Sequence, residues 1–308
     1  MLLGIGNDIV SIKRIKGAYQ KFGKRFEERI YTTEERKLVW KRGTPCFKTL
    51  SNRWAAKEAF VNSDWAEIRP TQRGKLLVGL AEIIEREAVR LGEIEVRDNG
   101  KLIAEMGAQT KYLAEWYRYY GGLADKIEGA VIPSDKPGIF NFTRYEPLGV
   151  VGMITAWNSP LLLLAWKLAP ALAAGNTAVV KPSEFTSASS LEFMELIREA
   201  GFPKGVVNCI TGLGLEVGQP MVDHPDLDKV AFTGSDVAGQ KIYESAAKKI
   251  IPVTLELGGK SPNIIFKDAD FESAVMGAIS GIFAATGQTC KLFRQRSKIS
   301  RVRLGVLQ

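Results

Sequence analysis

GVVGMITAWNSPLLLLAWKLAPALAAGNTAVVK, residues 149–181, holds two short β-branched runs on either side of a longer apolar segment. The runs at Val150–Thr155 and Thr177–Val180 have the length and composition of buried strands. Between them, Leu161–Ala174 is long enough for a helix, and the polar turn at Asn158–Pro160 separates it from the first strand. Two strands joined by a helix predict a parallel pair, because the connection has to cross over the sheet.

The same alternation of strand and helix patterns continues to a predicted strand at Val253–Leu257. The intervening patterns are Ser189–Ala200, Val206–Ile210, Val217–Val222, Lys229–Phe232 and Ala238–Lys248. Upstream, apolar residues between Arg73 and Leu91 recur on one face of a predicted helix, which is expected to lie on the sheet. Capping-box spacing places helix starts at Ser189, with Glu192, and at Thr32, with Glu35. An α/β fold follows: a Rossmann-like, mostly parallel sheet with flanking helices.

The first sixty residues have a different pattern. A short apolar strand at Leu2–Ile5 precedes a helical stripe of apolar residues with Lys and Arg on its other side. This part is expected to form a small α+β fragment.

Charge is spread unevenly over the 308 residues, whose net charge is +8. Residues 1–60 carry 14 Lys and Arg against 6 Asp and Glu, residues 61–290 carry 22 against 28, and residues 291–308 carry 6 against none. A nucleic-acid-binding domain is expected to show a basic stripe interleaved with aromatic residues, which the mildly acidic middle lacks. Nucleic acid is therefore not an expected partner.

Cysteine usage and hydropathy indicate a cytoplasmic protein. Cys46, Cys209 and Cys290 form no CxxC pair, so neither a zinc cage nor a disulfide framework is indicated. The N-terminus lacks a basic leader. The uncharged stretch Pro147–Trp166 is long enough to suggest a membrane span, but the turn at Asn158–Pro160 interrupts it, so no membrane association is expected.

Glu256 and Cys290 suggest a reaction at a carbonyl group. A thiolate can add to a carbonyl carbon, and a carboxylate can deprotonate the water that releases the resulting thioester. Glu256 ends a predicted strand, where ligands collect in parallel sheets, and Cys290 follows a helical run ending at Gly287. The alternatives are a solvated glutamate and a buried structural cysteine.

Other candidates follow neighbouring strands. The Asn158 amide could donate a hydrogen bond to an oxyanion, although ordinary turn chemistry also explains it. Lys181 and Glu184 could bind the hydroxyls of a ribose, or could form a solvated turn. Gly234 and Ser235 enter a helix whose N-terminus would favour a pyrophosphate.

Far upstream, Asp8 and Glu58 could hold Mg²⁺ on a phosphate-bearing substrate, or could be unrelated surface groups.

Taken together, the motifs from about Ala55 to Cys290 resemble the aldehyde dehydrogenase superfamily. TAWNSP, GNTAVVKPSE, FTGS, LELGGKSP and GQTC occur in that family's order and spacing. The resemblance implies oxidation of a small-molecule aldehyde to a carboxylate, with NAD as cofactor and NADP as the alternative. It implies that Cys290 attacks the carbonyl, that Asn158 and the Cys290 amide hold the oxyanion, and that Glu256 activates the deacylating water. The residues implied to bind the cofactor are Trp157, Lys181, Glu184, Gly214, Gly234 and Ser235.

Residues 1 to about 60 resemble the first half of a holo-acyl-carrier-protein synthase, through GIGNDIV and RWAAKEAF. That likeness implies phosphopantetheinyl transfer from coenzyme A, with Mg²⁺ on Asp8 and Glu58. Arg14 and its basic helix would dock an acyl carrier protein.

The two likenesses divide the chain into a synthase-like fragment (1–60), an NAD(P)-binding domain (61–257), the start of a catalytic domain (258–290) and an unmatched basic tail (291–308). Neither likeness covers a whole family pattern, so a truncated, chimeric chain from a recombined or misassembled reading frame is expected. Because the oligomerisation strand of the dehydrogenase pattern is missing, a homo-oligomer is not expected. Impaired aldehyde oxidation, phosphopantetheinyl transfer and a non-catalytic cofactor-binding remnant remain the three functional hypotheses.

Overall fold

The computed structural model describes residues 60, 65, 67–259, 264–266 and 268–288. Expectations for Asp8, Glu58, the Thr32 capping box and Cys290 lie outside the described residues. So do the synthase-like fragment, apart from its last residue, and the basic tail.

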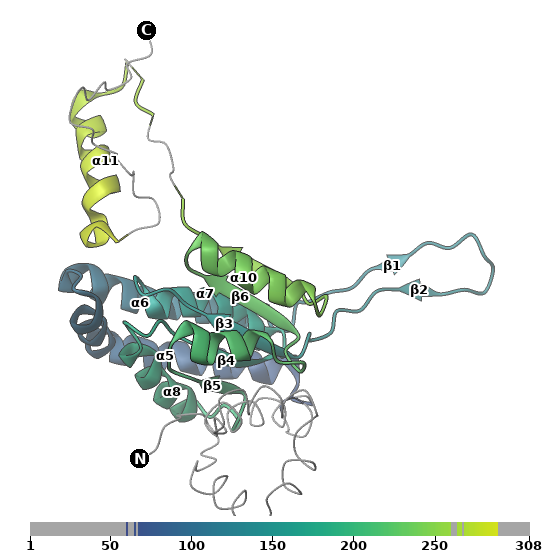
Figure 1. Cartoon of the computed structure of the whole chain (residues 1–308). Coiled ribbons are helices and arrows are strands. Elements are labelled where there is room, and N and C mark those ends of the chain that lie inside the picture. Colours follow the sequence, from purple (N-terminus) through teal and green to yellow (C-terminus); the bar gives the residue numbers. More distant parts are fainter. Residues whose placement is uncertain (1–59, 61–64, 66, 260–263, 267, 289–308) are drawn as a thin grey trace, which may run out of the picture.

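Five parallel strands form the central sheet, in the order β5-β4-β3-β6-β7 (Figure 1). They are β3 (Val150–Ile154), β4 (Thr177–Lys181), β5 (Val207–Cys209), β6 (Lys229–Thr233) and β7 (Val253–Glu256). Every neighbouring pair is parallel. The predicted strands and the parallel sheet are therefore confirmed, with small shifts at the strand ends.

Helices cover both faces of this sheet. On one side, α7 (Pro160–Ala173) and α8 (Ala188–Glu199) contact the strands, and α5 (Pro70–Asn99) and α6 (Ile103–Leu123) pack against these helices. On the other side lie a π-helical turn (Gly214–Gly218), α9 (Gln219–Val222) and α10 (Asp236–Ala247). Beyond β7 come α11 (Phe271–Phe283) and a short 3₁₀ turn (Ala284–Gly287).

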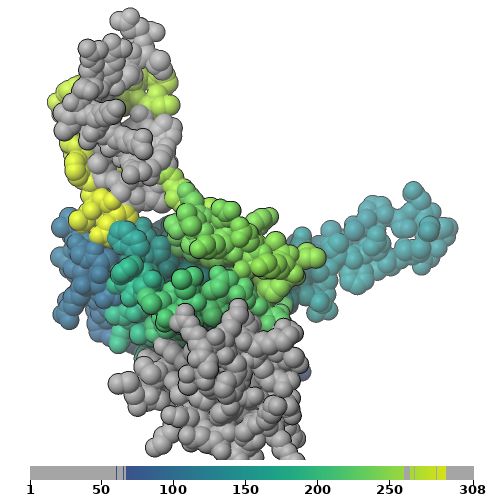
Figure 2. All heavy atoms as spheres, viewed as in Figure 1, coloured from purple at the N-terminus to yellow at the C-terminus, as the bar shows by residue number. Residues whose placement is uncertain are grey.

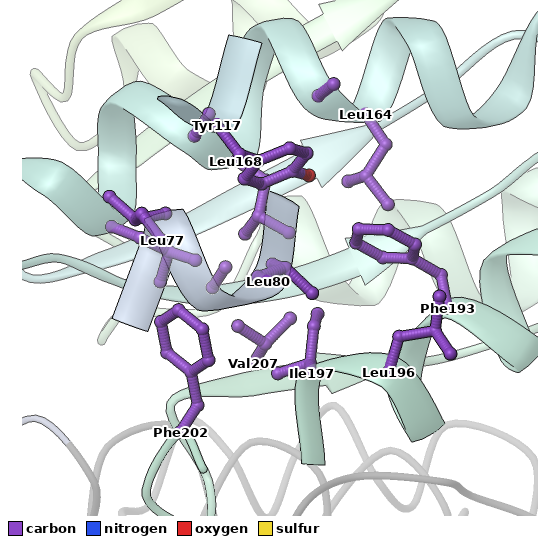
Figure 3. Close-up of a cluster of buried hydrophobic side chains, with 14 of the residues drawn as sticks. Leu77, Leu80, Tyr117, Leu164, Leu168, Phe193, Leu196, Ile197, Phe202 and Val207 are labelled. Atoms are coloured by element: carbon purple, nitrogen blue, oxygen red, sulfur yellow. The ribbon is translucent and has the colours of Figure 1, made fainter. Parts of the chain in front are cut away.

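Side chains alternate between two cores because successive strand residues point to opposite faces. On β3, Val151 and Met153 join the core beneath α5 to α8, whereas Val150 and Ile154 join the core beneath α9 and α10. Figure 3 shows the first core, where buried side chains from all four helices meet the sheet: Leu77, Leu80, Tyr117, Leu164, Leu168, Phe193, Leu196, Ile197, Phe202 and Val207. The helix expected at Arg73–Leu91 is thus confirmed within a longer α5.

The start predicted for α8 is wrong. The helix begins at Ala188, and the Ser189 hydroxyl lies inside it, donating to a Glu95 carboxylate oxygen at 3.4 Å. The reason is a cap from another helix: Asp98 of α5 accepts a hydrogen bond from the Ala188 N–H at 3.0 Å. A local capping box is not needed when a neighbouring carboxylate satisfies the first N–H groups.

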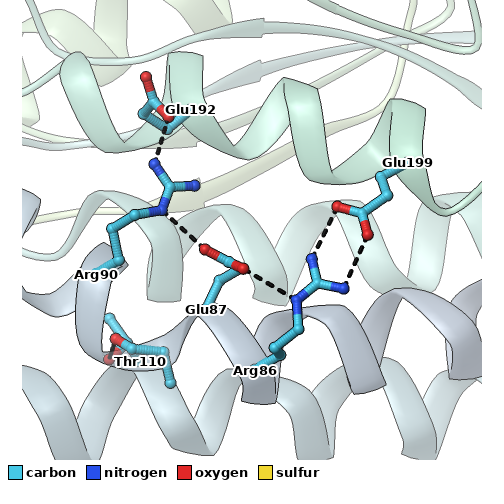
Figure 4. A network of polar contacts seen from close by, with 7 residues as sticks. Arg86, Glu87, Arg90, Thr110, Glu192 and Glu199 are labelled. Carbon is cyan, nitrogen blue, oxygen red and sulfur yellow. Dashed lines mark hydrogen bonds and ion pairs between the residues drawn. The ribbon is translucent and has the colours of Figure 1, made fainter.

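Ion pairs join α5 to α8 across the surface (Figure 4). Arg86 makes a two-pronged contact with Glu199, with both distances 2.8 Å, and Arg90 contacts Glu192 at 2.6 Å. Glu87 bridges the two arginines. Because these side chains are largely solvated, they orient the helices more than they stabilise them.

Two features had no counterpart in the sequence expectations: α6 and a hairpin of β1 (Val131–Ile132) with β2 (Asn141–Phe142). The hairpin projects from the body in Figures 1 and 2, and both strands are exposed. Among the described residues, no helix combines the length and apolar character needed to cross a membrane.

The α5–α6 contact depends on a glycine. A Cβ added at Gly74 would lie 2.5 Å from the Gly121 carbonyl oxygen, whereas one added at Gly79 of the same helix would meet nothing within 4 Å. We expect Gly74→Ala to lower the free energy of unfolding by about 2 kcal/mol, since backbone cannot yield as a side chain can. Gly79→Ala should raise it by up to about 1 kcal/mol through helix propensity. Urea denaturation of both variants tests this, and equal effects would contradict it.

Candidate active site

The candidate residues follow strands whose carboxyl ends share one edge of the sheet. Strand pairing sets Ile154 beside both Lys181 and Phe232, and Thr233 beside Glu256. The chain builds the sheet outward from β3 to β5 and then returns to place β6 on the other side of β3. In open α/β sheets, ligands bind outside the carboxyl ends at such a reversal.

The turn after β3 carries Trp157 and Asn158. Trp157 is 46% exposed, and the half-buried Asn158 donates from Nδ2 to the Gln288 carbonyl oxygen at 2.7 Å. Cys290 itself lies outside the described residues, but it follows Gln288 by two positions. The structure therefore brings the predicted oxyanion donor to the segment that precedes the predicted nucleophile.

Glu256 ends β7 with its side chain exposed. Beside it, Lys167 of α7 donates to the Thr233 hydroxyl at 2.6 Å and lies close enough to feel the Glu256 charge. Burial lowers the pKa of Lys167 to about 8, and the attraction of Glu256 opposes this shift. Lys167 was not among the predicted site residues, although a lone lysine in an apolar helix was a usable signal.

Lys181, the last residue of β4, contacts Glu184 in the turn that follows. The buried Lys181 ammonium donates to the Pro182 carbonyl at 3.0 Å and to the Glu184 carboxylate at 3.3 Å. Gly218 lies against the Lys181 chain, since a Cβ there would be 3.3 Å from Lys181 Cδ. Gly214 lies exposed at the start of the same π-helical turn.

Ser235 is the N-cap of α10, and its hydroxyl accepts a hydrogen bond from the Ala238 N–H at 3.3 Å. Gly234 precedes it directly after β6. The start of α10 therefore opens at the sheet edge, where the partial positive charge of a helix N-terminus favours an anion.

Two buried ionisable side chains, Glu95 and Lys101, support the Asn158 turn from behind. Glu95 accepts from the Leu161 N–H at 2.9 Å and so caps α7, while Lys101 donates to the Ser159 hydroxyl at 2.7 Å. Both side chains are almost fully buried. Burial raises the pKa of Glu95 to about 7, which the Leu161 hydrogen bond and the Lys101 charge partly offset. Neither residue could be identified from local pattern, because their partners lie far along the chain.

The raised pKa of Glu95 predicts a pH dependence of stability. With a folded pKa of about 7 and an ordinary value of 4.5, the folded state binds more protons between these values, so stability falls as pH rises through this window. Glu95→Gln stays neutral at every pH. Its free energy of unfolding, taken relative to that of the parent, should therefore be about 2 kcal/mol higher at pH 8 than at pH 5. Urea denaturation at both pH values measures it. Glu93→Gln, an exposed control on α5, should show no such gain.

Comparisons with known proteins agree with this arrangement. Residues 51–296 match the family model described as the aldehyde dehydrogenase family, and residues 4–61 match that of the 4′-phosphopantetheinyl transferase superfamily. The chain is 52% identical over 236 residues to a (Z)-2-((N-methylformamido)methylene)-5-hydroxybutyrolactone dehydrogenase from Acinetobacter baylyi. It is 44% identical over 236 residues to a betaine aldehyde dehydrogenase from Bacillus subtilis. Each alignment covers 77% of this chain and 48% of the relative.

A solved structure shares the fold. The NAD⁺ complex of an aldehyde dehydrogenase from Bacillus cereus matches with a TM-score of 0.77 and 46% identity, over 79% of this chain and 50% of that one. The chain thus spans about half the length of the curated relatives it matches. With a family match over most of its residues and the same parallel sheet, the chain belongs to the aldehyde dehydrogenase family.

Proposed function

We propose that residues 61–290 perform NAD-dependent oxidation of a small-molecule aldehyde to a carboxylate through a cysteine thioester. The supporting observation is the hydrogen bond from Asn158 Nδ2 to the Gln288 carbonyl, which brings a turn at the sheet edge to the segment before Cys290. The family match and the position of Glu256 at the same edge support it further.

In this proposal the Cys290 thiolate adds to the aldehyde carbon, and the carbonyl oxygen becomes an oxyanion that the Asn158 amide stabilises. Loss of a hydride from that carbon restores the carbonyl as a thioester. Glu256 then removes a proton from water, the resulting hydroxide attacks the thioester, and the thiolate leaves as the carboxylate forms.

NAD, when bound, supplies the hydride acceptor for this chemistry. The groups that fit it are the N-terminus of α10 with Ser235, which suits a pyrophosphate, and the Lys181–Glu184 pair, which suits ribose hydroxyls. A Cβ added at Gly214 would meet nothing within 4 Å, whereas Gly234 packs against the Phe232 ring. The exposed Trp157 offers an aromatic surface at the same edge. The Glu184 carboxylate would repel a 2′-phosphate, so NAD is favoured over NADP.

Lys167 is proposed to attract the Glu256 side chain and so to orient it at the sheet edge. Its ammonium is placed by the Thr233 hydroxyl, so its charge acts from a fixed position beside the base. The substrate is proposed only as an aldehyde, because the relatives named above act on chemically different molecules.

Cofactor binding and its selectivity can be measured by fluorescence titration with NADH and NADPH. We expect NADH to bind the chain more tightly than NADPH. Because Glu184 is exposed, Glu184→Gln should leave the fold intact. It should lower the ratio of the NADPH to the NADH dissociation constant about fivefold, because the repulsion between the carboxylate and the 2′-phosphate is removed. The exposed Glu128→Gln is the matched control. No NADH signal at millimolar concentration would remove the cofactor proposal, whereas binding without aldehyde-dependent NADH formation would favour the non-catalytic remnant.

A second candidate function rests on the separate match of residues 4–61 to the phosphopantetheinyl transferase superfamily. We propose that this part uses Asp8 and Glu58 to hold Mg²⁺ on coenzyme A, with the basic residues around Arg14 docking an acidic carrier protein. Incubation with coenzyme A, Mg²⁺ and an apo acyl carrier protein should add the mass of one phosphopantetheine arm to the carrier. Asp8→Asn should abolish the gain, and an unmodified carrier with the parent chain would eliminate this function.

A further inference from the structure

The α5–α6 connection, taken as residues 99–105 from the last residue of α5 into the first turn of α6, contacts both sides of the candidate site. Lys101 Nζ donates to the Ser159 hydroxyl at 2.7 Å, next to Asn158. The Asn99 carbonyl accepts from Gln288 Nε2 at 2.7 Å. This connection therefore contacts both the Asn158 turn and the segment that precedes Cys290.

Glu105, in the first turn of α6, adds a third contact. Its Oε1 accepts from the Ala285 N–H at 3.0 Å. Ala285 and Thr286 have φ values of 55° and 57°, in the left-handed region that non-glycine residues rarely adopt. Each such residue costs on the order of 1 kcal/mol, so the turn persists only where its surroundings hold it.

Helix α11, which leads into this turn, does little to hold it. None of its described side chains is buried, and Phe271, Met276 and Phe283 are more than half exposed. Among the described residues, three side-chain hydrogen bonds tie the turn and Gln288 to the body of the protein: those from Ala285 to Glu105, from Gln288 to Asn99 and from Asn158 to Gln288.

We infer that Glu105 is a positioning residue for the Cys290 thiol, acting by fixing the strained Ala285–Thr286 turn against the α5–α6 connection. Two residues of chain span at most about 7 Å, so the placement of Gln288 limits where the thiol can lie. The same connection holds Ser159, so the segment before the nucleophile and the Asn158 turn both contact one element. This inference rests on the proposed nucleophilic role of Cys290.

The test is the rate at which iodoacetamide alkylates each cysteine, followed by peptide mass spectrometry. In the parent, Cys290 should react faster than Cys46, and the buried Cys209 should not react while the sheet is folded. Glu105→Ala should slow alkylation of Cys290 about fivefold, the effect of losing one hydrogen bond on the population of the aligned turn. Glu105→Gln keeps an acceptor oxygen and should restore the parent rate. Glu93→Ala, an exposed α5 carboxylate, is the control.

The outcomes separate this inference from the proposed function. If Cys290 in the parent reacts no faster than Cys46, the nucleophilic function and the inference both fall. If Cys290 is activated in the parent and reacts as fast in Glu105→Ala, only the positioning role falls. Equal slowing in Glu105→Gln would overturn the hydrogen-bond argument, and new labelling of Cys209 would show that the substitution opens the sheet rather than the turn.

Discussion

Parallel pairing of β3 with β6 is the contact on which the candidate site depends. It brings the turn after β3 and the start of α10 to the same edge, and the next pair adds Glu256 beside Thr233. Because strand side chains alternate, a shift of one residue would exchange the two faces of β6 and bury the wrong side chains in both cores. The two apolar cores therefore fix the register, and the register in turn fixes which polar groups meet at the edge.

Behind that edge, the structure uses buried charge where an apolar core would be simpler. Glu95 caps α7 from another helix and Lys101 holds the Ser159 hydroxyl, although burying either charge costs free energy. Ser159, which occupies the N-cap position, makes no side-chain cap of its own. The position of the Asn158 turn is thus set by α5 and its connection to α6. Burial of Glu95 and Lys101 costs free energy, and their hydrogen bonds to Leu161 and Ser159 fix the geometry of the turn.

The sheet could be predicted from the sequence because each strand is a short buried run and each crossover helix has its own apolar pattern. The row of Asn158, Lys181, Gly234 and Glu256 followed from the rule that parallel strands end together. The start of α8 was wrong because Asp98, ninety residues away, supplies the cap. The bonds from Asn158 to Gln288 and from Glu105 to Ala285 leave no local pattern, since 130 and 180 residues separate the partners. Helix α6, with buried residues on one side and exposed tyrosines on another, mixes aromatic residues around its circumference and so hides its period.

Cofactor binding and thiol chemistry place different demands on this chain. The groups proposed for the cofactor lie on a sheet whose two faces are both covered by helices, and their positions follow from packing within the described residues. The proposed nucleophile instead follows a helix that has no buried side chain among its described residues and a turn in a costly backbone conformation. The turn and Gln288 are held by a few hydrogen bonds, whose net contributions are each about 1 kcal/mol. Of the two proposed activities, cofactor binding therefore depends on the better-packed part of the fold, and the proposed reactivity of Cys290 depends on the part that small changes at the α5–α6 connection can alter.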